Sequence, residues 1–182
     1  MTLEPRDIVS FWQDEVGPDR WFGGDDALDA KIARRFRGRW QEARDGKLQA
    51  WETSVEGALA LLLLLDQFPR NMFRGKREAF STDEAARGVA ERALKRGYDL
   101  MMPAGLRAFF YLPFMHSENM GDQDRSVSLI TGRLGTAAMN YPFALAHRDE
   151  IARFGRFPHR NAALGRRSTA AERDFLVKSQ PR

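Results

Sequence analysis

Apolar residues recur every three or four positions along most of the chain, which predicts a protein built almost entirely of helices. One stretch places Leu28, Ile32, Phe36 and Trp40 on a single helix face. No segment shows the alternation of apolar and polar residues that is typical of a half-buried strand, and β-branched residues are sparse. We therefore predict an all-α fold of about seven to nine helices, packed as stacked helix hairpins.

Capping patterns indicate where several of these helices begin. A Ser or Thr that is followed three residues later by Glu can bond the free N–H groups of a helix start. This pattern occurs at Thr53, Ser81 and Thr169. Pro103 and Pro142 suit the first turn of two further helices, where the missing N–H group costs nothing. We therefore expect a helix to begin at or near each of these five residues.

Two segments repeat the order Phe-Pro, Arg-Asn, Gly and Ser-Thr. They begin with DQFPRN at residues 66–71 and with RFPHRN at residues 156–161. Because proline disfavours helix at the residue before it, we expect helices to end ahead of Pro69 and Pro158. Arginine can bond the carbonyl groups that are freed there, and asparagine can close the turn. We expect both corners to lie together at the centre of the helical stack.

Length and composition limit the classes of protein that this chain can represent. Its 182 residues fit a single domain spanning residues 1–182. The absence of cysteine excludes disulfides and thiolate metal sites. The net charge is +4, but the arginines are spread along the chain and many stand beside acids, so we expect no nucleic-acid partner.

We expect neither a membrane-spanning helix nor an export signal in this sequence. Its most apolar run, residues 58–65, is far shorter than the ~20 residues of a membrane-spanning helix. The N-terminal residues lack the basic and apolar regions of a signal peptide. We therefore expect a cytoplasmic protein without a membrane partner, whereas its oligomeric state has no indicator in the sequence.

Histidines and carboxylates could carry chemistry if the fold brings them together. The histidines are His116, His147 and His159. Their spacing matches no metal motif, so we expect neither a metal nor a cofactor. A hydrolase would use His116 or His147 as general base, oriented by Asp66 or Glu118. Ser117 lies between a histidine and a glutamate in sequence, but a catalytic triad needs residues that converge from separate elements.

The arginines in and beside the two Phe-Pro segments are the most distinctive polar residues, because a guanidinium binds carboxylate or phosphate through two parallel hydrogen bonds. In our first hypothesis, Arg70 and Arg160 hold one anion and His116 donates to it. The candidate ligand-binding residues are Arg70, Asn71, His116, Glu118, Arg156, His159, Arg160 and Asn161. In the alternative interpretation, these arginines pair with neighbouring carboxylates and only hold the corners together.

Three functions remain open on these grounds. The first is a protein that binds a small anionic ligand or an acidic peptide through this Arg/His/Asn-lined centre. The second is a hydrolase with a His/carboxylate site. The third is a scaffold that grips another protein with a concave helix face, which a large exposed apolar patch would favour.

Four ordered motifs resemble one bacterial family, known as domain of unknown function 924. They read LDQFPRNMFRG, AFSTDEAA, FYLPFMHSE and RFGRFPHRNAALGR, and they follow an FW pair at residues 11–12 and a WF pair at residues 21–22. The resemblance covers nearly the whole chain. It implies an all-α fold with a tetratricopeptide-like, right-handed arrangement of helix hairpins. Since the activity of this family is not established, the resemblance implies no reaction and no site residues.

Overall fold

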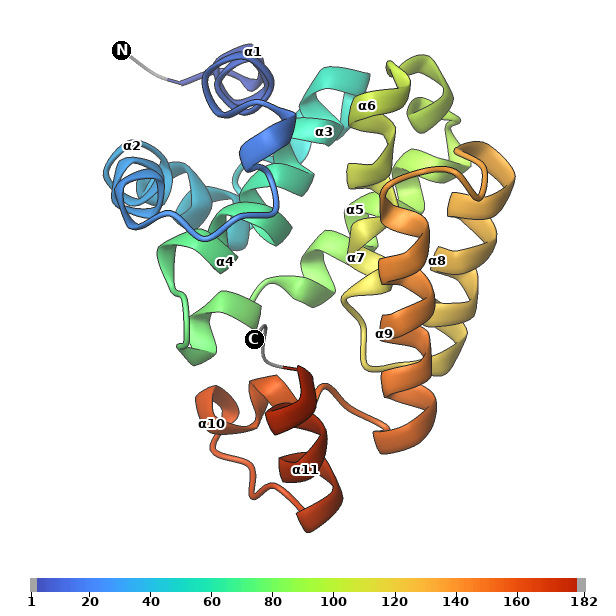
Figure 1. The fold of residues 1–182 in the computed structure, drawn as a ribbon. Coiled ribbons are helices and arrows are strands. Elements are labelled where there is room, and N and C mark those ends of the chain that lie inside the picture. The colour runs from blue at the N-terminus through green and yellow to red at the C-terminus, as the bar shows by residue number, and fades with distance from the viewer. Residues whose placement is uncertain (1–2, 180–182) are drawn as a thin grey trace. The chain divides into compact units, whose positions relative to one another are not determined.

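The computed structural model describes residues 3–179, and these residues form helices and turns with no strand, which confirms the all-α class (Figure 1). The chain forms two compact units. The first unit comprises Met1–Arg74 and Glu78–Pro113, and the second comprises Gly75–Arg77 and Phe114–Arg182. Within residues 3–179, no helix has the length and apolarity needed to cross a membrane. The tetratricopeptide-like arrangement stays a prediction.

The first unit contains α-helices joined by short 3₁₀ and π turns (Figure 1). Its α-helices are α1 (Pro5–Ser10), α2 (Asp26–Arg44), α3 (Val55–Leu62), α4 (Phe68–Met72), α5 (Asp83–Lys95) and α6 (Ala104–Arg107). Its π turns are η1 (Phe11–Val16) and η4 (Leu63–Gln67), and its 3₁₀ turns include η3 (Gln49–Thr53), η6 (Tyr98–Met101) and η7 (Ala108–Phe110).

The second unit is built around a helix hairpin. Helices α8 (Met120–Arg133) and α9 (Asn140–Phe154) run side by side (Figure 1). The 3₁₀ turn η8 (Pro158–Arg160) follows, and then α10 (Asn161–Leu164) and α11 (Ala170–Ser179). A further short helix, α7 (Leu112–Met115), precedes α8 in the chain.

The apolar face predicted for residues 28–40 forms part of the first unit's core. Leu28, Ile32, Phe36 and Trp40 of α2 are all buried. The ring of Phe36 packs against that of Phe68 at a centroid distance of 4.9 Å. Burial of a large aromatic side chain contributes about 1.5–3 kcal/mol, so this stripe is a main source of stability.

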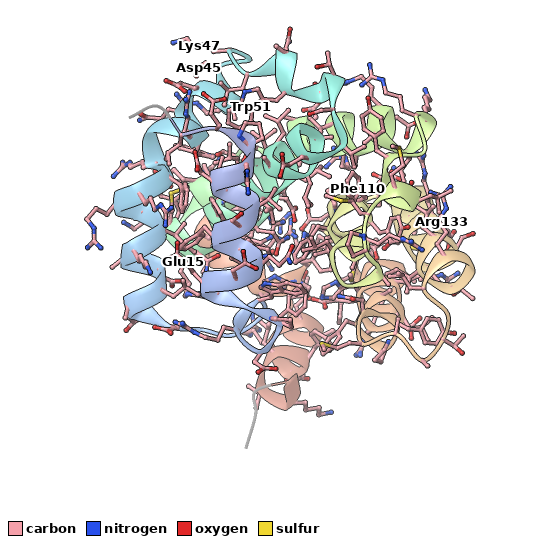
Figure 2. All side chains as sticks on the ribbon, turned by 90° about the horizontal axis from the view of Figure 1, so that it is seen from above. Glu15, Asp45, Lys47, Trp51, Phe110 and Arg133 are labelled. Carbon is pink, nitrogen blue, oxygen red and sulfur yellow. The ribbon has the colours of Figure 1, made fainter. Side chains whose placement is uncertain are left out.

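Surface charges add contacts between elements of the first unit. Glu15 of η1, which is labelled in Figure 2, accepts hydrogen bonds from two residues of α2. The donors are Lys31 at 2.9 Å and Arg35 at 2.7 Å. The ion pairs of Glu15 are exposed to solvent, so we expect them to contribute less to stability than buried core residues do. Phe110, also labelled in Figure 2, is one of these fully buried residues.

The predicted start at Thr53 is wrong by one residue. Ser54 caps α3, and its Oγ accepts a hydrogen bond from the Gly57 N–H group at 3.1 Å. A Cβ atom at position 57 would lie 2.1 Å from the main-chain oxygen of Trp51, so the close approach of η3 requires glycine there. Similarly, Thr82 rather than Ser81 precedes α5, whereas the capping box at Thr169 is confirmed.

The expectation that the helix ends ahead of Pro69 is wrong, because α3 continues through η4 into α4. Pro69 has no N–H group for the Leu65 carbonyl one turn earlier. The Thr82 hydroxyl donates to that carbonyl instead, at 2.6 Å. The same expectation is confirmed at Pro158, since α9 ends at Phe154, the next residue Gly155 has a φ of 67°, and the chain is extended at Phe157.

Candidate functional site

The His-Ser-Glu turn between α7 and α8 is held by side chains of the second unit. Arg160 donates from Nη2 to the main-chain oxygen of His116 at 2.9 Å. Gln123 donates from Nε2 to the oxygens of Met115 at 2.7 Å and Ser117 at 2.6 Å. Three consecutive carbonyl groups are therefore bonded by long side chains, which fixes the turn.

Glu118 connects this turn to the second Phe-Pro segment. Its carboxylate accepts hydrogen bonds from Arg166 at 2.7 and 2.9 Å and from the Phe157 N–H group at 2.9 Å. Burial opposes ionisation of Glu118, but the Arg166 and Phe157 hydrogen bonds outweigh it and lower the pKa of Glu118. Glu118 is therefore a charged acceptor at pH 7.

A second arginine–glutamate pair fixes α11. Arg156 donates to Glu172 at 2.6 and 2.9 Å, and the Thr169 N–H group donates to the same carboxylate at 2.6 Å. These bonds, led by that of Arg156, lower the pKa of Glu172 to about 2. The pairing also raises the pKa of Arg156, so both groups are ionised at physiological pH.

Arginines also surround the main chain between α10 and α11. We call residues 164–168 the arginine loop. The donors are Arg77, Arg156 and Arg173, and the acceptors are the main-chain oxygens of Leu164, Arg167 and Ser168, at 3.0, 3.0 and 2.7 Å, respectively. These arginines therefore stabilise the loop, because they donate hydrogen bonds to main-chain oxygens that have no donor within a helix.

These arginines outnumber the carboxylates that bond them. The arginines that contact the loop, belong to it or face Glu118 are Arg77, Arg156, Arg160, Arg166, Arg167 and Arg173. Within residues 3–179, Glu118 pairs with Arg166 and Glu172 pairs with Arg156. Arg156 and Arg166 are each paired with one glutamate, while Glu150 and Asp174 add further negative charge to the same unit.

Three members of the set lie at the surface without a carboxylate partner in the described part of the chain. Arg77, Arg167 and Arg173 are exposed, and none forms an ion pair with a carboxylate within residues 3–179. Arg77 and Arg173 each donate to a carbonyl, and the Arg167 side chain makes no hydrogen bond within the same range. These guanidinium groups retain donors that an incoming anion could use.

The three histidines lie in the second unit, and two of them contact Phe157. His147 packs against the Phe157 ring at a centroid distance of 5.2 Å, and His159 packs against it at 5.5 Å. The His116 and His147 rings are 6.4 Å apart. His159 is exposed, and its Nδ1 lies 3.7 Å from Oε1 of Glu150. Among the described residues, no group of three or more histidines and carboxylates could hold a metal ion.

The Ser117 hydroxyl points toward a carboxylate on α8. It is buried and donates to Oδ2 of Asp122 at 2.6 Å. A serine nucleophile donates to an imidazole that accepts its proton, so this geometry gives the hydrolase alternative no support at Ser117. Glu118 is already occupied by Arg166 and the Phe157 N–H group.

Arg70 and Asn71, the first-motif candidates, belong to the first unit. The Nη1 atom of Arg70 lies 3.2 Å from Oδ1 of Asp66 and 3.0 Å from Oδ1 of Asp83. Asn71 donates to Oδ1 of Asp29 at 2.8 Å. Two carboxylates therefore share the Arg70 guanidinium, which leaves fewer of its donors for a ligand. A pocket shared by both Phe-Pro segments stays a prediction.

The other six candidates all belong to the second unit, where Glu118, Arg156 and Arg160 form the contacts described above. In that unit, Asn161 donates from Nδ2 to the Ser168 hydroxyl at 3.0 Å. The candidate set omitted Arg77, which lies 87 positions from Leu164 and outside both motifs. No local pattern could identify such a partner, because only folding brings it to the loop.

Comparison with known protein families and solved structures finds proteins that are similar to this chain. A family model described as "Bacterial protein of unknown function (DUF924)" matches residues 8–180. The chain is also similar to the solved structure of a protein of unknown function, ATU0120 from Agrobacterium tumefaciens, with 43% identity and a TM-score of 0.91. That alignment covers 96% of this chain and 97% of the other. The search of curated proteins gave no match.

Proposed function

The chain belongs to the bacterial family of unknown function DUF924, and we propose that it binds a small anionic ligand at the arginine loop. The ligand presents a phosphate or carboxylate group, which an acidic peptide could also supply. The proposal includes the cytoplasmic location that the sequence predicts.

The proposal rests on three exposed arginines around residues 164–168 that form no ion pair with a carboxylate within residues 3–179. Glu118 and Glu172 neutralise part of the set through two-bonded pairs with Arg166 and Arg156. Those pairs hold the loop in place, while Arg77, Arg167 and Arg173 keep exposed charges on it. A rigid loop with uncompensated guanidinium groups suits an anion, because the protein need not reorganise to bind it.

The buried members of the set have a supporting role. Arg160 is only 6% exposed, and its guanidinium lies 4.5 Å from the Phe157 ring centroid while it donates to His116. We propose that Arg160 positions the His-Ser-Glu turn and that the exposed arginines contact the ligand. His159 is exposed in the same segment, and an imidazole N–H group can donate a further hydrogen bond.

Isothermal titration at low ionic strength, with inorganic phosphate and phosphoserine as probes, tests this function. Arg167→Gln removes a charge without removing a hydrogen bond formed within residues 3–179. A charge-assisted hydrogen bond contributes about 1.5–3 kcal/mol, so we expect roughly tenfold weaker binding or more. Arg34→Gln is the matched control, because Arg34 is an exposed arginine of α2 in the first unit.

Retained affinity in Arg167→Gln, or an equal loss in Arg34→Gln, would overturn the proposal. Added salt should weaken binding to the wild-type protein, since exposed charges are screened. The hydrolase and scaffold alternatives have no comparable observation in their favour. They stay predictions.

A further inference from the structure

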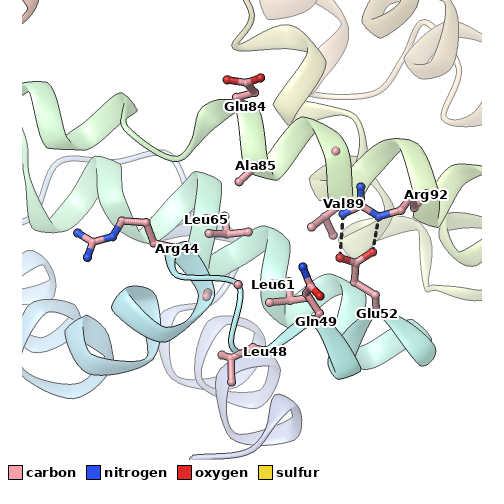
Figure 3. Close-up of a pocket in the computed structure, with 13 residues that line it drawn as sticks. Arg44, Leu48, Gln49, Glu52, Leu61, Leu65, Glu84, Ala85, Val89 and Arg92 are labelled. Carbon is pink, nitrogen blue, oxygen red and sulfur yellow. Dashed lines mark hydrogen bonds and ion pairs between the residues drawn. The ribbon is translucent and has the colours of Figure 1, made fainter.

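The first unit contains a cavity at some distance in sequence from the arginine loop. It has a volume of about 280 Å³ and lies among the end of α2, η3, α3 and α5 (Figure 3). None of its lining residues belongs to the second unit. The cavity is therefore a feature of the first unit alone, and it is independent of the proposed anion site.

The floor of this cavity is apolar. Leu48, Leu61, Leu65 and Val89 line it, and they are 8%, 3%, 2% and 4% exposed (Figure 3). These side chains are already nearly buried, so a ligand would remove only a small further apolar area from water, but they offer an apolar surface for a ring to pack against.

Small residues of α5 leave the space open. Ala85 and Gly88 stand one turn apart on the helix and both line the cavity. For a Cβ atom at Gly88, the nearest neighbour would be Nη1 of Arg92, at 3.2 Å. A larger side chain at either position would therefore enter the cavity and compete with a ligand.

The charges that line the cavity balance each other. They are those of Arg44, Arg92, Glu52 and Glu84. Arg92 donates two hydrogen bonds to Glu52, at 2.6 and 2.8 Å, which joins α5 to η3 along one wall (Figure 3). Two positive and two negative groups give no net attraction for a charged ligand, in contrast with the arginine loop.

From this geometry, we propose that the cavity binds an uncharged, mostly apolar small molecule of about two fused rings. By size alone, a volume of about 280 Å³ accommodates a bicyclic molecule, because a cavity of about 150 Å³ can hold benzene. The amide of Gln49, which lines the cavity near Leu61, offers both a donor and an acceptor for one polar group of the ligand (Figure 3).

Methyl NMR of the full chain, titrated with indole as an uncharged bicyclic probe, tests this site. We expect saturable shifts of the Leu61, Leu65 and Val89 methyl signals. Gly88→Leu fills the cavity and improves helix propensity, so we expect the protein to fold and the affinity for indole to fall at least tenfold. Gly38→Leu on α2 is the matched control, because nothing lies within 4 Å of a Cβ atom at position 38.

Ala85→Leu fills the same space from the neighbouring turn and serves as a second variant if Gly88→Leu does not fold. Loss of binding in a folded cavity variant, with retention in Gly38→Leu, supports the site. Linear, non-saturating shifts in the wild-type protein, or unchanged affinity in a folded cavity variant, would overturn it. Phosphate binding should be equal in all these variants, so the outcome is separate from that of the anion site.

Discussion

Glu118 and Arg166, which are 48 positions apart in the chain, form a two-bonded ion pair within the second unit. The Oε2–Nη1 distance is 2.7 Å and the Oε1–Nη2 distance is 2.9 Å. The pair joins the turn before α8 to the loop before α11, and both side chains are about three-quarters shielded from solvent. An ion pair in this setting is screened less than one at the surface.

Glu118→Gln should lower the free energy of unfolding by about 1–3 kcal/mol, because it leaves Arg166 without a charged acceptor. Arg166→Met should cost a similar amount, and the double variant should cost less than the sum of both. Urea denaturation of the four proteins measures this coupling. Asp124→Asn breaks the exposed pair with Arg148 and is the control, with an expected cost of about 0–1 kcal/mol. Additive effects of the Glu118 and Arg166 substitutions would show that the pair is not energetically coupled.

Stability should depend on pH through Glu172. Because the folded pKa of about 2 lies below the ordinary value of 4.5, the folded state favours the ionised carboxylate. Its stabilising effect is complete above pH 4.5 and is lost as the pH falls toward about 2. The stability difference between the wild-type protein and Glu172→Gln should therefore shrink across this range, as followed by urea denaturation at several pH values.

Carboxyl NMR titration checks the cause of this low pKa. In Arg156→Gln the pKa of Glu172 should rise toward 4.5, because the largest favourable interaction of the carboxylate is removed. An unchanged pKa in that variant would mean that the Thr169 N–H group, rather than Arg156, sets the ionisation.

The helical class was predictable because burial repeats locally. Leu28, Ile32, Phe36 and Trp40 recur at the helical period, and all four are in the core. Boundaries were less predictable, because competing partners lie far away in sequence. The Thr82 hydroxyl bonds a carbonyl 17 positions earlier, and this bond supports a helix that continues through Pro69.

The candidate site was predictable only in part. Arg156 and Arg160 stand out because rigid donors are dense around one proline. Glu118 was a candidate from the His-Ser-Glu motif and Glu172 was expected to complete a helix cap, but the particular arginine that each one bonds could not be predicted, because folding decides which residues meet. The cavity could not be predicted from the sequence either. Ala85 and Gly88 leave space for it only when folding places α5 opposite η3.

The bond between Thr82 and Leu65 gives a last prediction. Thr82→Val preserves the side-chain shape but removes the donor to the Leu65 carbonyl and the acceptor of a long hydrogen bond from the Trp40 indole, so unfolding should become easier by about 1–3 kcal/mol. In a Pro69→Ala background the restored N–H group can donate to Leu65, and the same substitution should cost at least about 0.5 kcal/mol less. Thermal and urea unfolding of the four proteins measure both costs. Thr131→Val on an exposed face of α8 is the control, with an expected change within about 0.5 kcal/mol. Equal costs of Thr82→Val in both backgrounds would mean that Thr82 does not compensate for the proline.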